Sequence, residues 1–154
     1  MKIRRATMED FEKLKEIKIL SKNEEIKYSN TLNPISENKE IYYFYLKKDL
    51  TYKNRGVFIA LDDNKVIGII LAQYFKPLVI SKYSKKGYIS NLYILKSHRR
   101  KKIGVKLAEH ALKWLKKNNV GHVNLEIHVD NKAALKLYNK LGFKDYTVKL
   151  AKEI

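Results

Sequence analysis

A basic segment that ends in a glycine, residues 96–104, has the composition of an anion-binding turn. It reads Lys-Ser-His-Arg-Arg-Lys-Lys-Ile-Gly and follows the apolar run 87–95. Apolar residues then recur at helical spacing over 103–117, at Ile103, Leu107, Ala111, Leu112 and Leu115. The first N–H groups of a helix have no intrahelical acceptor, and cations at that end are unfavourable unless an anion lies there. The segment therefore predicts a phosphate-binding site at the start of helix 103–117, with a solvated basic turn as the alternative.

Asn131 and Tyr138 are a second pair of polar residues with informative spacing. They lie on a predicted helix that runs from Asn131 to about Leu141. Seven residues apart, they share one helix face two turns from each other. On its own, Tyr138 is compatible with plain packing, because the chain has 11 Tyr.

Glu126 is the candidate general base, and His128 is the candidate next to it. Both fall in a predicted strand at 122–129, two residues apart, so their side chains point to the same face. Either would relay a proton through water. A charge in a strand is rarely chosen for packing, but a solvent-facing or salt-bridged Glu126 is also consistent with the sequence.

Several common catalytic arrangements are absent from the sequence. There is no Cys, so there is no thiolate nucleophile or thiolate metal site. The four His form no helical His-x3-His pair, no Ser lies in a Gly-x-Ser-x-Gly context, and the P-loop spacing is missing. The sequence therefore favours neither a metal centre nor a serine hydrolase.

The elements that would position these residues alternate between strands and helices. In chain order we predict a strand at 2–6, a helix at 8–20 started by Thr7 and Asp10, a polar stretch at 21–38, a helix at 39–50, a hairpin of 57–61 and 66–72, a loop at 77–87, and a strand at 87–95. Helix 103–117, strand 122–129, helix 131–141 and a last strand after Gly142-Phe143 complete the set. This is an α/β pattern: one domain over 1–154, with a mixed central β-sheet flanked by about four helices.

The chain is strongly basic. Its 33 Lys and Arg exceed its 16 Asp and Glu, for a formal charge of +17, and it is rich enough in apolar residues (45%) to fold. Such a surface attracts polyanions, but most of the cations are Lys, spread through the chain, and Lys reads phosphates and bases less specifically than Arg. No apolar run is long enough to cross a bilayer, and charges occupy the place of a signal peptide's apolar stretch. We expect a cytoplasmic protein with no membrane partner, and nucleic acid is a disfavoured partner.

Together, the two segments resemble the signature motifs of the GNAT (Gcn5-related N-acetyltransferase) superfamily. The run NLYILKSHRRKKIGVKLAEHAL is similar to its acetyl-coenzyme A binding strand, turn and helix. The run LEIHVDNKAALKLYNKLGF is similar to its later strand, Asn-x-x-Ala helix with a Tyr, and Leu-Gly-Phe turn. The order of elements matches along 1–154.

The resemblance implies an acetyl-CoA-dependent N-acetyltransferase, an acyltransferase without a metal, that acts on a primary amine by direct attack through a tetrahedral intermediate. The acceptor would be a protein or peptide N-terminus, a lysine or a small amine. The implied cofactor-binding residues are Leu92, Tyr93, Ile94, Arg99, Arg100, Lys101, Lys102, Ile103, Gly104, Val105, Asn131 and Tyr138. The implied catalytic groups are the Tyr138 hydroxyl as general acid, Glu126 as base and the Ile94 N–H at the acyl oxygen.

One residue departs from the family pattern. Lys102 stands where the turn has its first glycine, and its side chain would either crowd the pyrophosphate path or contact a phosphate. The acceptor site is expected between residues 21–50 and 77–88, whose carboxylates are Glu24, Glu25, Glu37, Glu40 and Asp49. The alternative to an enzyme is a basic nucleic-acid- or ribosome-associated binding module on the same fold, without turnover. Monomer and homodimer both remain open.

Overall fold

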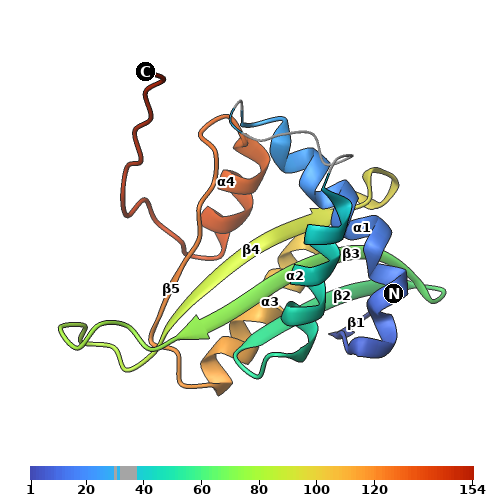
Figure 1. Cartoon of the computed structure of the whole chain (residues 1–154), viewed down its shortest axis with the longest axis horizontal. Helices are drawn as coiled ribbons and strands as arrows, with labels where there is room; N and C mark the ends of the chain where they lie inside the picture. The colour runs from blue at the N-terminus through green and yellow to red at the C-terminus, as the bar shows by residue number, and fades with distance from the viewer. Residues whose placement is uncertain (30, 32–37) are drawn as a thin grey trace.

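A five-stranded sheet with the strand order β1-β2-β3-β4-β5 runs through the molecule (Figure 1). The structure is a computed structural model that describes residues 1–29, 31 and 38–154. The strands are β1 (Lys2–Arg5), β2 (Arg55–Asp62), β3 (Lys65–Phe75), β4 (Lys86–Ile94) and β5 (His122–Asn124). The first four pair antiparallel, whereas β4 and β5 pair parallel, so the sheet is mixed as the sequence predicts.

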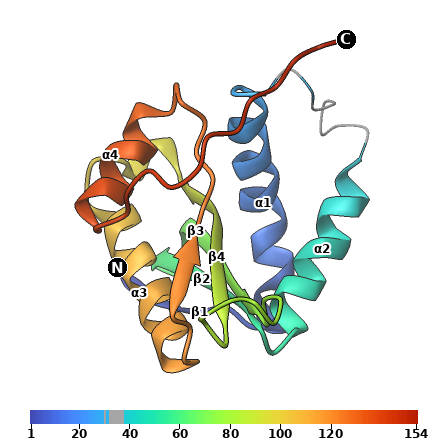
Figure 2. The same cartoon turned by 90° about the vertical axis from the view of Figure 1, so that its left-hand side faces the viewer.

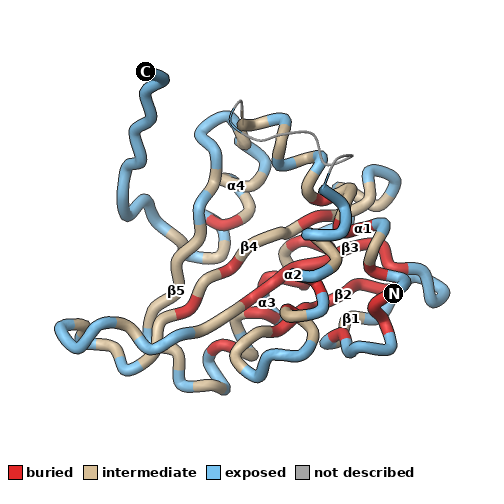
Figure 3. The backbone as a smooth tube through the Cα atoms, viewed as in Figure 1, coloured by how far each residue is buried: buried red, intermediate tan, exposed pale blue. Residues whose placement is uncertain are grey.

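Four helices in the described part of the chain cover the two faces of this sheet (Figure 2). Helices α1 (Phe11–Ile26) and α2 (Lys39–Thr51) lie on one face, and α3 (Ile103–Lys117) and α4 (Lys132–Lys140) lie on the other. The central strands β2 and β3 are buried on both faces, which explains why their sequences read as continuous apolar runs (Figure 3). The predicted α/β architecture is confirmed.

The β2–β3 hairpin is the clearest case of a local sequence that determines a turn. Asp63 and Asn64 form its two-residue loop, with φ angles of 43° and 65°. Both lie in the left-handed region that a type I′ turn requires, and Asn and Asp tolerate that region better than most residues. The hairpin predicted from 57–61 and 66–72 is confirmed, and the structure extends both strands.

Helix α1 ends at Ile26, six residues beyond the predicted helix 8–20, so the predicted loop start at residue 21 is wrong. The polar run continues the helix because Ser21 faces the core and is buried. On the exposed side, ion pairs three residues apart join Lys22 to Glu25 and Lys27 to Glu24, and such pairs support a helix. The rest of the predicted polar stretch includes residues 30 and 32–37, which lie outside the described residues.

The strand predictions at the C-terminal end are wrong in two places. Strand β5 comprises only His122–Asn124, not 122–129, and residues 142–154 contain no strand. Tyr146, Val148 and Leu150 keep the alternating pattern of a strand, but all three are exposed. An alternating pattern yields a strand only where it pairs with a neighbouring edge, and among the described residues this segment pairs with none, although the Tyr146 ring lies 5.3 Å from that of His122 on the edge strand β5.

Candidate active site

A bulge divides β4 into two halves. Its register against β3 runs through the pairs Leu71–Ser90 and Ile69–Tyr93, with an irregularity between them. Asn91, within the bulge, has a φ of 55°, and its side-chain amide donates to the Ser90 hydroxyl at 3.1 Å. An extra residue in one strand reverses the side-chain alternation beyond it. Ile89 therefore packs toward α3, whereas Tyr93, four residues later, packs toward α1.

Beyond the bulge, one edge of β4 has no partner strand among the described residues. Strand β5 pairs with β4 only from Lys86 to Tyr88, and the two chains diverge after that point (Figure 1). The Leu95 N–H donates to the Ile67 carbonyl of β3 at 2.9 Å. Because successive residues of a strand present their backbone groups to opposite sides, the Ile94 N–H points away from β3, into the gap between β4 and β5.

The start of α3 lies directly after this open edge. Arg100 and Lys102 both have left-handed φ angles, 67° and 59°, and Lys102 is the N-cap of the helix. No side chain caps this end, and its first turn contains no acidic residue. The predicted helix start is confirmed, and its N–H groups have the arrangement that an anion requires. The Lys102 side chain is exposed.

Gly104 allows α4 to approach α3 closely. A Cβ atom at this position would lie 2.9 Å from Cδ1 of Leu137 on α4, which is tighter than van der Waals contact. The same position faces Leu92 of β4, whose Cδ2 would be 3.7 Å away. The glycine therefore fixes the spacing between the helix that starts at the turn and the helix that carries Tyr138.

The Arg99 side chain packs against the turn before α3 and holds it to β4 and α1, instead of extending into solvent. Its Nε donates to the Ile94 carbonyl at 3.0 Å, and its Nη1 lies 3.4 Å from Oε1 of Glu24 on α1. Its guanidinium also lies over the ring of Tyr93, 5.4 Å from the centroid. These contacts occupy the side chain that the sequence assigned to the cofactor phosphates. Arg100 and Lys101 are exposed beside it.

Tyr138 is buried in the core between α3, α4 and the sheet, with 6% of its surface exposed. Its ring packs edge-on against Phe143, with centroids 5.4 Å apart. Burial raises the pKa of the phenol far above its usual value. No described residue hydrogen-bonds its hydroxyl, so the phenol O–H has no protein acceptor there and is able to donate to a ligand.

Asn131 caps helix α4, as expected for its position before that helix. Its Oδ1 accepts a hydrogen bond from the Ala134 N–H at 3.1 Å. This local role was not foreseen, although Asn is among the preferred N-cap residues. Among the described residues, no acceptor contacts the side-chain NH2, which leaves it able to donate to a ligand.

Glu126 and His128 lie beyond the end of β5, not on a strand. The Glu126 side chain is 70% exposed, and its Oε2 lies 3.6 Å from Nζ of Lys149. The His128 ring packs against Tyr28 at 5.6 Å, and its Nδ1 lies 3.5 Å from the Asp130 carboxylate. In the described part of the chain neither residue contacts Tyr138. Their roles therefore stay predictions.

The structure adds Tyr88 to this group. Tyr88 and Asn124 are the last pair of the β4–β5 ladder, so Tyr88 marks the point where the strands separate. Burial raises the pKa of its phenol, and the nearby carboxylates of Glu126 and Glu25 raise it further. Sequence reasoning does not single out Tyr88, because the position where two strands stop pairing is not encoded in either strand alone.

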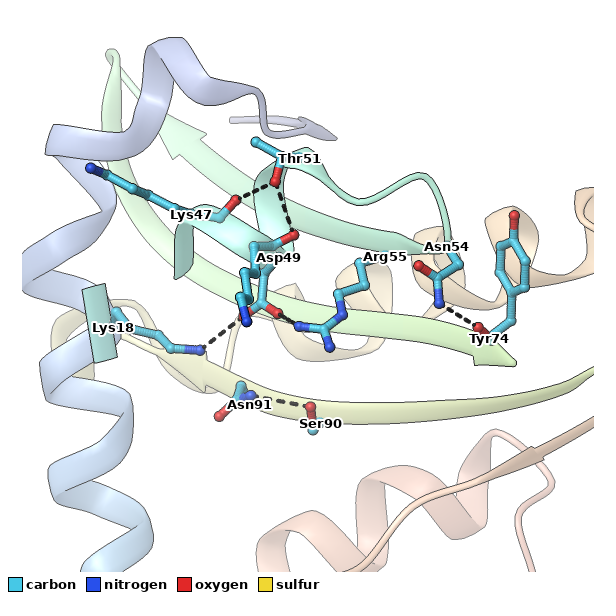
Figure 4. A network of polar contacts seen from close by, with 10 residues as sticks. Lys18, Lys47, Asp49, Thr51, Asn54, Arg55, Tyr74, Ser90 and Asn91 are labelled. Carbon is cyan, nitrogen blue, oxygen red and sulfur yellow. Dashed lines mark hydrogen bonds and ion pairs between the residues drawn. The ribbon is translucent and has the colours of Figure 1, made fainter. Parts of the chain in front are cut away.

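Two parts of the expected acceptor site lie elsewhere. Asp49 is buried, with its carboxylate 3.5 Å from Lys18 Nζ and 2.8 Å from Arg55 Nη1 (Figure 4). It stabilises α1 against α2 and is not available to attract an amine, and burial lowers the pKa of Lys18 against the pull of Asp49. The loop 76–85 is at the start of β4, at the opposite end from Leu92–Ile94. Glu37 lies outside the described residues.

No group of three or more His, Asp or Glu side chains within residues 1–29, 31 and 38–154 is placed to hold a metal ion. No helix in the same ranges is both long and apolar enough to span a bilayer.

Comparison with known proteins identifies the family. The family model described as "Acetyltransferase (GNAT) family" matches residues 20–143. The chain is 34% identical over 112 residues to an N-alpha-acetyltransferase of Sulfurisphaera tokodaii, covering 70% of this chain and 66% of that protein. It is 36% identical over 89 residues to N-alpha-acetyltransferase 30 of Schizosaccharomyces pombe, covering 58% of this chain and 57% of that protein.

A solved structure shows the same fold. The acetyl-CoA complex of a predicted acetyltransferase from Clostridium acetobutylicum superposes with a TM-score of 0.78 at 23% identity, covering 99% of this chain and 95% of that one. The chain belongs to the GNAT family of acetyltransferases. Its matches span two thirds or less of the length of these curated relatives.

Proposed function

We propose that this protein is an acetyl-CoA-dependent N-acetyltransferase whose acceptor is the α-amino group of a protein or peptide. The observation that carries the proposal is the unpartnered edge of β4, which leads directly into the uncapped start of α3. An open strand edge suits an extended amide chain, and a helix N-terminus suits a phosphate. Acetyl-CoA presents these two groups in this order. The relatives named as N-alpha-acetyltransferases favour an α-amine acceptor.

The residues present fit the cofactor. The backbone of Leu92–Ile94 would hold the pantetheine arm, and the N–H groups of residues 100–104 would hold the pyrophosphate. Lys101 and Lys102 would add positive charge, and the free NH2 of Asn131 would donate to the arm. Arg99 would act indirectly, by fixing the turn to β4 and α1. When bound, acetyl-CoA supplies an activated acetyl group as a thioester.

Three groups would move or stabilise charge. The Ile94 N–H points into the gap and would stabilise negative charge on the acyl oxygen. The Tyr138 hydroxyl, kept protonated by burial, would give its proton to the departing sulfur. Glu126 would take a proton from the amine through water, beside Tyr88, which stays protonated and would orient that water by hydrogen bonding.

Release of free thiol from acetyl-CoA tests this function. Peptides with a free α-amine are compared with the same peptides blocked at the N-terminus but carrying an internal lysine. We expect turnover with the free α-amine, and a loss of about 100-fold or more in Tyr138→Phe, because a positioned acid contributes that much. Tyr146→Phe is the matched control, since Tyr146 is 70% exposed. Equal rates with blocked peptides would overturn the acceptor, and full activity of Tyr138→Phe would overturn the acid.

A further inference from the structure

The loop between β3 and β4 exposes three consecutive aliphatic side chains. Leu78, Val79 and Ile80 are 80%, 102% and 94% exposed. The Ser81 N–H donates to the Leu78 carbonyl at 2.9 Å, which closes a turn with Val79 and Ile80 at its two corners. Turn corners usually carry Gly, Pro, Asn, Asp or Ser. Two β-branched aliphatic residues at the corners bury no surface in this chain, so the fold does not explain them.

The base of this loop is fixed to the body of the protein. Lys85 Nζ donates to the Asn118 carbonyl at 2.9 Å, and the Gly121 N–H donates to the Lys85 carbonyl at 3.2 Å. The Tyr83 ring stacks on His122, with centroids 5.3 Å apart and planes 26° apart. The aliphatic turn is therefore presented on an anchored support that projects beyond the sheet (Figures 1 and 3).

The surroundings of the turn are basic. No Asp or Glu occurs between Asp63 and Glu109, nor between Glu109 and Glu126. Six lysines lie in the loop, at the first position of β4 and at the end of α3 that the loop contacts: Lys76, Lys82, Lys85, Lys86, Lys116 and Lys117. An aliphatic tip surrounded by lysines is complementary to a surface with anionic groups outside and hydrocarbon beneath.

We infer that the β3–β4 loop is a docking element for an anionic phospholipid bilayer, with Leu78, Val79 and Ile80 inserted at the boundary between headgroups and acyl chains. The phosphates of a nucleic acid would pair with the lysine ammonium groups, but a nucleic acid has no apolar surface that would bury the three aliphatic side chains. The sequence predicts no membrane partner because no apolar run spans a bilayer, but insertion of a turn requires no span. The loop precedes Lys86 at the start of β4, whereas the edge proposed for the cofactor, Leu92–Ile94, lies at the other end of that strand, roughly 25 Å away at about 3.3 Å per residue, so docking leaves that edge open.

Sedimentation with phosphatidylcholine vesicles, with and without phosphatidylserine, tests the inference on the full chain. The test variant is the double substitution Val79→Asp with Ile80→Asp. Its matched control is Val148→Asp with Leu150→Asp, which makes the same charge change at aliphatic side chains 86% and 88% exposed. We expect binding only to vesicles with phosphatidylserine, at least about tenfold weaker in the test variant and within about twofold of the unmodified protein in the control.

Both variants should keep their melting temperature, since neither pair is buried in the core. The test variant should also keep its thiol release without vesicles, since no residue of the turn is part of the candidate active site. This separates failure of the docking inference from failure of the proposed function. Equal weakening in both variants would show adsorption by net charge alone and would overturn the inference. Absence of binding to phosphatidylserine vesicles would also overturn it, as would tip-dependent binding to duplex RNA without vesicle binding.

Discussion

At the scale of single residues, Lys102 has an unfavourable backbone conformation and lies in the turn proposed to hold the pyrophosphate. A side chain at a φ of 59° is strained by roughly 1 kcal/mol, a cost that glycine avoids. We expect Lys102→Gly to raise the free energy of unfolding by about 0.5 kcal/mol, which is less than the strain because glycine also loosens the unfolded chain. Urea unfolding measures this. Lys101→Gly, at a position without a positive φ, should destabilise instead, and a destabilised Lys102→Gly would contradict the strain argument.

Asp10 makes stability depend on pH. Arg4 donates to both of its carboxylate oxygens, at 2.7 and 2.8 Å, and the Thr7 N–H donates at 2.9 Å. The hydrogen bonds from Arg4 lower the pKa of Asp10 in the folded state, against the effect of burial. Because the folded pKa lies below the unfolded one, this contribution is complete above the unfolded pKa and is lost as pH falls through the folded pKa.

We therefore expect Asp10→Asn to lower the free energy of unfolding by about 2 kcal/mol at pH 7, because it leaves the half-buried Arg4 without its carboxylate. The difference from the unmodified protein should shrink as pH falls below about 4. Urea titrations at several pH values measure this. The control is Glu9→Gln, which changes an exposed neighbouring carboxylate. If the difference in the free energy of unfolding between Asp10→Asn and the unmodified protein did not change with pH, Asp10 would not be the source of the pH dependence.

At the scale of elements, the contact of α3 with α4 sets where Tyr138 lies. A side chain at Gly104 meets Leu137, the residue before Tyr138. We expect Gly104→Val to cost about 1–3 kcal/mol of stability through overpacking and to reduce thiol release further, because α4 moves away from β4. Gly104→Val combined with Leu137→Ala makes room again and should recover part of both. No recovery would mean that the helix spacing does not control the site.

The sequence predicts elements well wherever a pattern and its partner are both local. Asp63-Asn64 specifies the β2–β3 turn on its own, and the stripe from Ile103 to Leu115 defines α3. Predictions of where a helix or strand ends fail where contacts with another element determine that end. The length of β5 depends on the bulge at Asn91 in β4, and the continuation of α1 depends on core space for Ser21. For the same reason the spacing of Asn131 and Tyr138 predicts that both belong to one helix, which α4 confirms, but no spacing singles out Tyr88.

At the scale of the whole molecule, the charge of +17 requires that specific binding be separated from general attraction to anions. We expect acetyl-CoA at about 100 times its Kd to raise the melting temperature by roughly 5–10 °C, at low and at moderate salt alike. An unrelated polyanion should raise it only at low salt, because salt screens exposed charges. Thermal melting measures both. If the increase in melting temperature with acetyl-CoA vanished at moderate salt, a specific cofactor site would be excluded, and the alternative of a basic binding module without turnover would be favoured.

The open edge of β4 also has a consequence for the exchange of amide hydrogens with solvent. The Leu95 amide is held by the carbonyl of Ile67, and the register places Tyr93 in the same ladder. The amides of Leu92 and Ile94 face the gap, and no strand in the described ranges pairs with them. Protection along this half of the strand therefore alternates residue by residue. A ligand bound in the gap slows hydrogen exchange at the Leu92 and Ile94 amides and leaves the protected amides unchanged. The exchange rates of these two amide hydrogens therefore report whether the gap is occupied.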